Sequence, residues 1–188
     1  MGVARCGACV THPLPFAYAL AAVDYAYPWS TLVGGLKFHG ATGLAAVMAE
    51  LIAERVCEAG RTAAVDALLP LPLGRARLAE RGMNQAWEIA RRLARRLRLP
   101  ANAFALQRRV ETPHLADLPR AERARAIRGA FALAPGAATR LHGRRVALLD
   151  DVMTTGATAA EAAHTLLEAG VGSVDLWVFA RTAAPGEM

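Results

Sequence analysis

Short apolar runs alternate along the chain with longer segments in which apolar residues recur at helical spacing. Buried strands are predicted at 16–27, 65–72, 144–150 and 173–179, with a shorter strand at 104–109. Helices are predicted at 28–38, 44–56 and 156–169, and another follows Asn84, a residue type that favours the N-cap position. Strands that alternate with helices are typical of an α/β fold, in which helices cover both faces of a mostly parallel sheet.

Two of the predicted helices have one apolar face. In the first, the apolar residues at helical spacing are Leu44, Val47, Met48, Leu51, Ile52 and Val56, and the same face predicts a core position for Cys57. In the helix after Asn84, the buried stripe is Ile89, Leu93 and Leu97, with most of the arginines on the opposite side. From 110 to 129 the pattern weakens into a charged stretch with two prolines, which predicts a long loop with a helical piece.

The composition is that of a folded globular protein. Of the 188 residues, 54% are hydrophobic and 20% charged, which excludes a disordered chain and suits one domain of ordinary size. No apolar run approaches the ~20 residues that span a bilayer, and the longest candidate is interrupted by Asp24 and Pro28. The N-terminal residues lack the apolar centre of a secretory signal, so we expect a cytoplasmic protein without membrane insertion.

The positive charge comes almost entirely from arginine. The net charge is +6, Lys37 is the only lysine, and seventeen arginines fall between Arg75 and Arg145. Arginine suits planar, bidentate contacts with phosphate, which favours an anionic ligand such as nucleic acid or a polyphosphate. A solvated basic face is the alternative, and charge alone does not separate the two.

The cysteine content argues against a disulfide framework and against a complete zinc site. Cys6 and Cys9 form one C-x-x-C pair, whereas a structural zinc ion needs four ligands. We therefore expect this pair to be at most an incomplete zinc site.

The stretch VALLDDVMTTGAT, residues 146–158, has the composition of a phosphate site. A hydrophobic strand leads into a turn rich in threonine and glycine, and a helix follows. The first N–H groups of a helix have no internal partner and favour an anion, and the hydroxyls of Thr154, Thr155 and Thr158 add donors. Gly156 lets the backbone approach closely. The turn matches neither the P-loop nor the dinucleotide glycine pattern.

Two adjacent carboxylates, Asp150 and Asp151, precede this turn. A carboxylate accepts hydrogen bonds and a vicinal diol donates two, so a ribose attached to the bound phosphate would explain the pair. Alternatively, Asp150 ends a strand, Asp151 begins a turn and the threonines cap a helix. The contiguity of the thirteen residues favours a ribose-phosphate ligand, with Mg²⁺ as a possible companion.

The same stretch resembles the signature of type I phosphoribosyltransferases, which bind phosphoribosyl pyrophosphate (PRPP). Residues 68–86, LLPLPLGRARLAERGMNQA, are similar to a segment of the ComF family, the competence-protein-F-like members of that class. Residues around Lys37 and from 108 to 131 resemble further segments of this family. The resemblance covers most of the chain from Phe16 onward and implies the type I phosphoribosyltransferase fold, which is Rossmann-like. Family members often begin with a four-cysteine zinc module, so residues 1–15 are interpreted as its remnant and 16–188 as the phosphoribosyltransferase-like domain.

The resemblance also implies roles for individual residues. Asp150 and Asp151 would hold the ribose hydroxyls, and the 5-phosphate would lie on Thr154, Thr155, Gly156, Ala157 and Thr158. The pyrophosphate would lie at Leu73, Gly74, Arg75 and Arg81, with Arg75 acting catalytically beside the two aspartates by neutralising the leaving group. Mg²⁺ would bridge the pyrophosphate, the ribose hydroxyls and water. A loop with Arg108, Arg109 and Thr112 would close over the site. Lys37 meets a phosphate or the acceptor, or is simply a surface lysine.

Two functions follow from the resemblance. One is transfer of a phosphoribosyl group from PRPP, with release of pyrophosphate, to an unidentified acceptor in a protein linked to DNA uptake. The alternative is a non-catalytic adaptor or a competence factor associated with single-stranded DNA, with DNA-processing proteins as partners.

Overall fold

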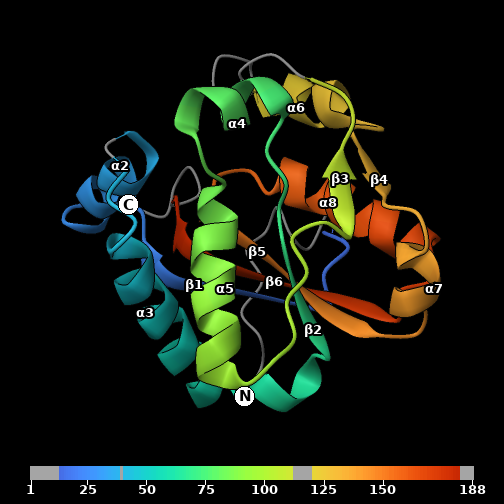
Figure 1. Cartoon of the computed structure of the whole chain (residues 1–188), viewed down its shortest axis with the longest axis horizontal. Coiled ribbons are helices and arrows are strands. Elements are labelled where there is room, and N and C mark those ends of the chain that lie inside the picture. Colours follow the sequence, from blue (N-terminus) through green and yellow to red (C-terminus); the bar gives the residue numbers. More distant parts are fainter. Residues whose placement is uncertain (1–12, 39, 112–119, 183–188) are drawn as a thin grey trace.

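A four-stranded parallel sheet forms the centre of the chain, in a computed structural model that describes residues 13–38, 40–111 and 120–182 (Figure 1). The strand order is β1, β6, β5, β2. The strands span Tyr18–Asp24 (β1), Ala67–Pro70 (β2), Arg145–Met153 (β5) and Ser173–Arg181 (β6). The predicted α/β architecture with a mostly parallel sheet is therefore confirmed.

Helices cover both faces of the sheet, as the alternating pattern predicts. On one face lie α2 (Trp29–Phe38), α3 (Leu44–Glu58) and α5 (Gln85–Leu97), with α3 and α5 side by side in Figure 1. On the other face lie α6 (Arg120–Ile127), α7 (Ala137–Leu141) and α8 (Ala157–Glu168). The remaining elements are a one-turn 3₁₀ helix (Thr62–Ala64), α4 (Arg75–Arg81) and an antiparallel pair, β3 (Leu106–Arg108) with β4 (Phe131–Leu133).

The two central strands are buried on both faces, which explains why they read as unbroken apolar runs. Every residue from Val174 to Ala180 in β6 is buried. Side chains of β5 and β6 alternate between the two cores: Leu149 and Trp177 pack with α3 and α5, whereas Leu148 and Leu176 pack with α8. This double burial fixes the register of β5, and with it the position of the residues that follow.

Some boundaries differ from the sequence predictions. The strand predicted to end at Asp150 continues through Asp151 to Met153, so both aspartates lie within the last residues of β5. Four short elements were not predicted: the 3₁₀ helix, α4, β4 and α7.

The prediction that Cys57 belongs to the core is wrong, because its side chain is exposed. The buried face of α3 is formed instead by Ala45, Met48, Ala49, Ile52, Ala53 and Val56. Three alanines belong to this face, and Cys57 and Val47, which is 49% exposed, lie outside it.

An ion pair joins the beginnings of β2 and β5. Arg145 donates to both carboxylate oxygens of Asp66, with 2.7 Å between Nη2 and Oδ1, and its backbone N–H donates to Oδ2 over 2.9 Å. These hydrogen bonds lower the pKa of Asp66 to about 2. A carboxyl group with a lowered pKa stabilises the fold above its ordinary pKa of about 4, and this contribution is lost as the pH falls toward 2.

We therefore expect Asp66→Asn to lower the free energy of unfolding by about 0.5–1 kcal/mol at pH 7, the range for a partly exposed pair. The difference from the wild type should shrink below about pH 4, as the wild-type carboxylate becomes protonated. Urea denaturation at pH 7 and pH 3 measures both values. Asp24→Asn, which removes an exposed carboxylate at the end of β1, is the matched control. If Asp66→Asn lowers the free energy of unfolding by as much at pH 3 as at pH 7, the assigned ion pair is contradicted.

Candidate functional site

A cavity of about 290 Å³ lies where the strands end at their carboxyl edge. Its wall combines the end of β5, the loop after β2, the start of α5 and Thr182, which follows β6. In open α/β sheets this edge is where ligands bind, because loops from neighbouring parallel strands converge there. The cavity contains most of the residues that the sequence singled out.

The two predicted carboxylates form one part of this wall. Asp150 is half-buried and Asp151 is buried, and each accepts a hydrogen bond from the N–H group of the following residue over 2.8 Å. Burial raises the pKa of Asp150 well above its ordinary value, and the charge of Asp151 raises it further. The strand thus holds two acceptor groups in a place where their charges need compensation.

Lys37 supplies a positive charge to this pair. Its Nζ lies 2.9 Å from Oδ2 of Asp151, and the two side chains are 20% and 11% exposed. Lys37 occupies the last turn of α2, where the helix dipole favours a cation. It lines the cavity and is therefore part of the site, not of the outer surface.

The predicted phosphate turn lies beside the carboxylates. Thr154 and Thr158 line the cavity, while Gly156 is the N-cap residue of α8 with a φ of 75°, a conformation that favours glycine. The hydroxyl oxygen of Thr155 accepts a hydrogen bond from the N–H group of Ala157 over 3.4 Å. Thr155, Gly156 and Ala157 thus form the turn that joins Thr154 to Thr158 and do not line the cavity themselves. The start of α8 therefore faces the cavity, as an anion site at a helix N-terminus requires.

Arginines form another part of the wall, but they are not the full set that was predicted. Arg77, Arg81 and Arg108 line the cavity, whereas Arg75 and Arg109 are exposed and lie outside the wall. Burial lowers the pKa of Arg108, and the nearby charge of Arg77 lowers it further. Cations placed so close together in a partly buried space are suited to a polyanionic ligand.

The predicted pyrophosphate loop is only partly open to the cavity. Leu73 lines it, but Gly74 is buried and the carboxylate of Glu111 lies against it. The same carboxylate accepts a hydrogen bond from the N–H group of Ala76 over 3.3 Å. An acidic side chain thus occupies the place where backbone donors were expected to meet a phosphate. Thr112, the next residue, lies outside the described residues, as do Cys6 and Cys9.

The start of α5 contributes polar groups that were not assigned from the sequence. Gln85 is 2% exposed and lines the cavity, and its Oε1 accepts from Arg81 over 3.1 Å. Its Nε2 is buried and has no hydrogen-bond partner among the described residues. Asn84 caps α5 through Trp87, as predicted, and also donates to the carbonyl of Leu71 in the loop after β2. In the sequence, Gln85 was marked only by its position in residues 68–86, the segment that resembles the ComF family.

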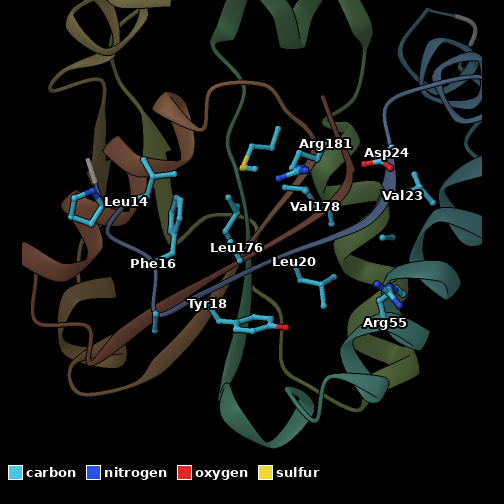
Figure 2. Close-up of a pocket in the computed structure, with 16 residues that line it drawn as sticks. Leu14, Phe16, Tyr18, Leu20, Val23, Asp24, Arg55, Leu176, Val178 and Arg181 are labelled. Carbon is cyan, nitrogen blue, oxygen red and sulfur yellow. The ribbon is translucent and has the colours of Figure 1, made fainter. Parts of the chain in front are cut away.

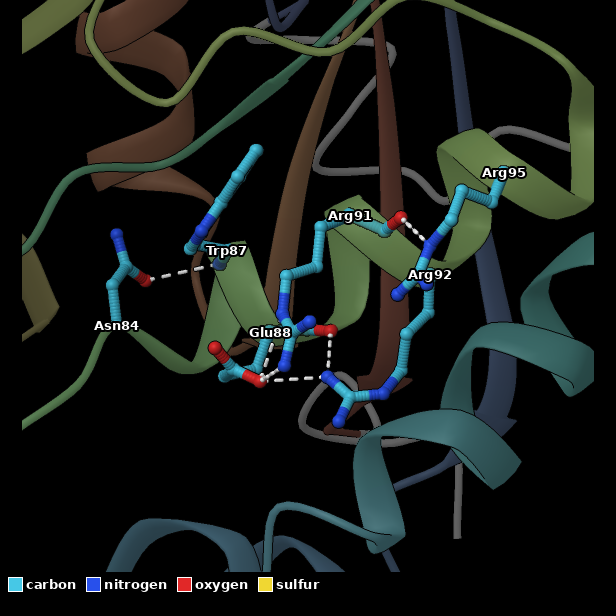
Figure 3. A network of polar contacts seen from close by, with 6 residues as sticks. All are labelled: Asn84, Trp87, Glu88, Arg91, Arg92 and Arg95. Atoms are coloured by element: carbon cyan, nitrogen blue, oxygen red, sulfur yellow. Dashed lines mark hydrogen bonds and ion pairs between the residues drawn. The ribbon is translucent and has the colours of Figure 1, made fainter.

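The arginine-rich face of α5 belongs to the helix surface and not to the cavity. Glu88 accepts from both Arg91 and Arg92 (Figure 3), and Arg96 pairs with Glu50 of α3 over 2.8 Å. Much of the positive charge on this face is therefore balanced within the protein. This arrangement agrees with the predicted split between an apolar stripe and a basic face.

A larger cavity of about 480 Å³ runs along β1 (Figure 2). Most of the residues that line it are apolar, with Phe16, Leu20, Leu176 and Val178 among them, and its charged side chains are Asp24, Arg55 and Arg181. It lacks the combination of paired carboxylates, a helix start and clustered arginines that the smaller cavity has. The chemistry therefore favours the smaller cavity as the functional site.

Two further observations limit the kinds of site in the described part of the chain. No three His, Cys, Asp or Glu side chains gather there in an arrangement that would hold a metal ion. Among the helices described, none has the length and apolar character needed to cross a membrane.

Comparisons with known proteins give relatives that match most of the chain. The chain is 33% identical over 180 residues to DNA utilization protein YhgH of Escherichia coli O157:H7, a match that covers 94% of the chain and 78% of that protein. It is 31% identical over 180 residues to competence protein F of Haemophilus influenzae, with the same coverage. A stretch of 36 residues, 19% of each chain, is 61% identical to adenine phosphoribosyltransferase of Nocardia farcinica. No protein-family model matches.

Among solved structures, the chain is similar to a purine phosphoribosyltransferase from Pyrococcus horikoshii. The TM-score is 0.42 and the identity 14%, over 91% of this chain and 94% of that one.

The position of Glu111 leads to a prediction about anion binding. Because its carboxylate lies beside the basic wall, it should repel an incoming diphosphate by about 1 kcal/mol, the scale for partly exposed charges. Glu111→Gln should therefore bind inorganic pyrophosphate roughly fivefold more tightly than the wild type in a calorimetric titration. Glu168→Gln, at the far end of α8, should leave the affinity unchanged. Weaker or unaltered binding by Glu111→Gln would show that the carboxylate does not compete with the anion.

Proposed function

Because the chain belongs to the family of DNA utilization protein YhgH and competence protein F, we propose that it is a PRPP-binding protein of the ComF type. In this proposal it transfers a phosphoribosyl group, with release of pyrophosphate, to an acceptor not yet identified. The activity would serve the handling of DNA, as the relatives' names suggest, in the cytoplasm.

One observation carries the proposal: paired carboxylates, a helix start and clustered arginines share a single cavity. Asp150 and Asp151 lie near the end of a buried strand, the start of α8 follows after a short turn, and Arg77, Arg81 and Arg108 line the same cavity. A ribose carries a vicinal diol, and PRPP carries a phosphate on one side of it and a diphosphate on the other. The cavity offers hydrogen-bond acceptors together with two groups of anion-binding donors, which are the groups that PRPP requires.

Each part of the ligand then has a place. The 5-phosphate lies on the turn at the start of α8, and the ribose hydroxyls donate to the two aspartates. The diphosphate lies toward the arginines and the start of α5, where the buried Nε2 of Gln85 can donate a hydrogen bond to it. The short local identity to an adenine phosphoribosyltransferase supports this assignment.

Mg²⁺ fits this site as a companion of the ligand and not as a resident of the protein. The described residues contain no three-carboxylate cluster, and one of the two aspartates is already paired with Lys37. Mg²⁺ keeps several waters and binds substrate phosphates readily, so the diphosphate and ribose would hold it. When bound, it would neutralise part of the diphosphate charge.

In the transfer step, a lone pair of the acceptor forms a bond to C1 of the ribose while the C1–O bond breaks. The electron pair of that bond leaves with the diphosphate, and the acceptor loses a proton to solvent or to a base. Arg77, Arg81 and Arg108 would stabilise the charge that develops on the leaving group. The aspartates would keep the ribose oriented as C1 gains positive character.

A non-catalytic adaptor is the second candidate, and one observation favours it. Phe38 is 70% exposed beside the site, with the guanidinium of Arg81 5.8 Å from its ring centre. Exposed aromatic rings next to arginines are suited to stacking with bases of single-stranded DNA. Release of pyrophosphate from PRPP with any of a panel of nucleobases and amines supports the enzyme, whereas PRPP binding without release supports the adaptor.

If the two aspartates hold the ribose, removing the negative charge of either Asp150 or Asp151 should weaken ligand binding. Hydrogen bonds that involve charged groups contribute about 1.5–3 kcal/mol, so Asp150→Asn and Asp151→Asn should each bind Mg-PRPP roughly ten- to a hundredfold more weakly. Asparagine keeps the shape, and the thermal unfolding of each variant should confirm an intact fold. Calorimetric titration measures the affinities. No heat and no thermal shift for the wild type with millimolar PRPP would refute the ligand assignment.

The arginine wall predicts a difference between two ligands. Arg77→Gln should weaken PRPP binding by roughly tenfold but change ribose 5-phosphate binding little, because only PRPP carries the diphosphate. Arg95→Gln is the matched control, since Arg95 is an exposed arginine on α5 outside the cavity. Equal losses for both ligands in Arg77→Gln would place that arginine near the 5-phosphate and overturn the proposed orientation.

A further inference from the structure

The ion pair between Lys37 and Asp151 joins parts of the chain that are far apart in sequence. Lys37 lies in the last turn of α2, and Asp151 lies near the end of β5. The distance of 2.9 Å and the low exposure of both side chains make this contact part of the cavity wall.

The buried oxygen of Asp151 depends on this lysine. No hydrogen bond from the described residues reaches Oδ2, whereas Oδ1 accepts from the N–H group of Val152. The attraction of the ammonium group is therefore what compensates the charge at Oδ2. A buried carboxylate without such a partner is strongly destabilising, and here a second carboxylate, Asp150, lies next to it.

The position of these charges matters for an anionic ligand. Two uncompensated carboxylates beside a phosphate site would repel the phosphate that the site has to bind. A fixed ammonium group removes one of the two negative charges before the ligand arrives. The ribose site then has acceptor oxygens for hydroxyl groups but only a small net charge.

We propose that Lys37 is a positioning residue that acts as the built-in counter-ion of the ribose-binding carboxylates. The ribose 5-phosphate part of the ligand then binds without a divalent cation, which is needed only where the diphosphate is present. This inference rests on the proposed function, because it assumes that the two aspartates hold a ribose. It assigns Lys37 to Asp151 and not to the ligand phosphates or the acceptor.

A double-mutant cycle tests the proposal with ribose 5-phosphate as the probe. The full-length chain, Lys37→Met, Asp151→Asn and the double variant are titrated by calorimetry in EDTA and in Mg²⁺. We expect the wild type to bind equally well, within about twofold, in both buffers. Lys37→Met should bind roughly ten- to a hundredfold more weakly in EDTA, because a buried charge is left unpaired. Added Mg²⁺ should restore part of this loss.

The double variant separates an indirect role from a direct contact. If Lys37 acts through Asp151, the double variant should bind within about threefold of Asp151→Asn alone, because the carboxylate that Lys37 pairs with is already absent. If Lys37 contacts the ligand directly, the losses of binding free energy in Lys37→Met and in Asp151→Asn should add in the double variant. This result would overturn the proposal. A wild type that needs Mg²⁺ for ribose 5-phosphate would overturn it as well.

Controls distinguish folding from binding. Lys37→Arg keeps the charge and should bind within a few-fold of the wild type, and the double variant removes both members of the ion pair, so that neither is left without the other. Arg144→Met removes one positive charge at the opposite end of β5 and should leave binding unchanged. If the wild type binds neither ribose 5-phosphate nor PRPP, the proposed function itself fails. If it binds both and the losses add, only the role of Lys37 is wrong.

Discussion

Two carboxylates at the end of an otherwise apolar strand set the constraint around which this site is arranged. β5 is buried on both faces up to Leu149, so its next residues emerge at a fixed place and Asp150 and Asp151 cannot move apart. Their mutual repulsion has to be compensated locally. Backbone N–H groups and the ammonium of Lys37 supply that compensation in the absence of a ligand. The donors that remain, at the starts of α8 and α5 and on the arginines, are then directed toward an anionic ligand.

The distribution of arginines shows how one residue type serves two purposes. On α5, Glu88 and Glu50 hold arginines in ion pairs at the helix surface, where they contribute little to binding. Around the cavity, burial lowers the pKa of Arg108 and the nearby charge of Arg77 lowers it further, and Arg77, Arg81 and Arg108 line the same space. Proteins tolerate such proximity where a negative ligand relieves it. The basic composition therefore includes both a solvated face and a group of arginines at the cavity proposed as the ligand site, and these correspond to the two alternatives that charge alone left open.

The sequence predicted the sheet, its main helices and the phosphate turn because buried parallel strands and amphipathic helices leave strong local patterns. It did not predict α4, β4 or α7, which are too short to show a period. The position of Cys57 was wrong because Ala45, Ala49 and Ala53 share the buried face of α3 with Met48, Ile52 and Val56, and this face does not include Cys57. Within the site, adjacent residues such as Asp150 and Asp151 could be recognised from the chain. The ion pair of Lys37, the amide of Gln85 and the carboxylate of Glu111 over Gly74 depend on contacts between distant segments, which local patterns do not contain.

The central claim is that the smaller cavity binds a ribose phosphate between the start of α8 and the arginine wall. A crystal structure of the protein soaked with Mg-PRPP tests it most directly. The account predicts the 5-phosphate on the turn from Thr154 to Thr158, the ribose hydroxyls within hydrogen-bonding distance of Asp150 or Asp151, and the diphosphate toward Arg77 and Gln85. A ligand found in the apolar cavity along β1, or one bound with its ribose away from both aspartates, would contradict it.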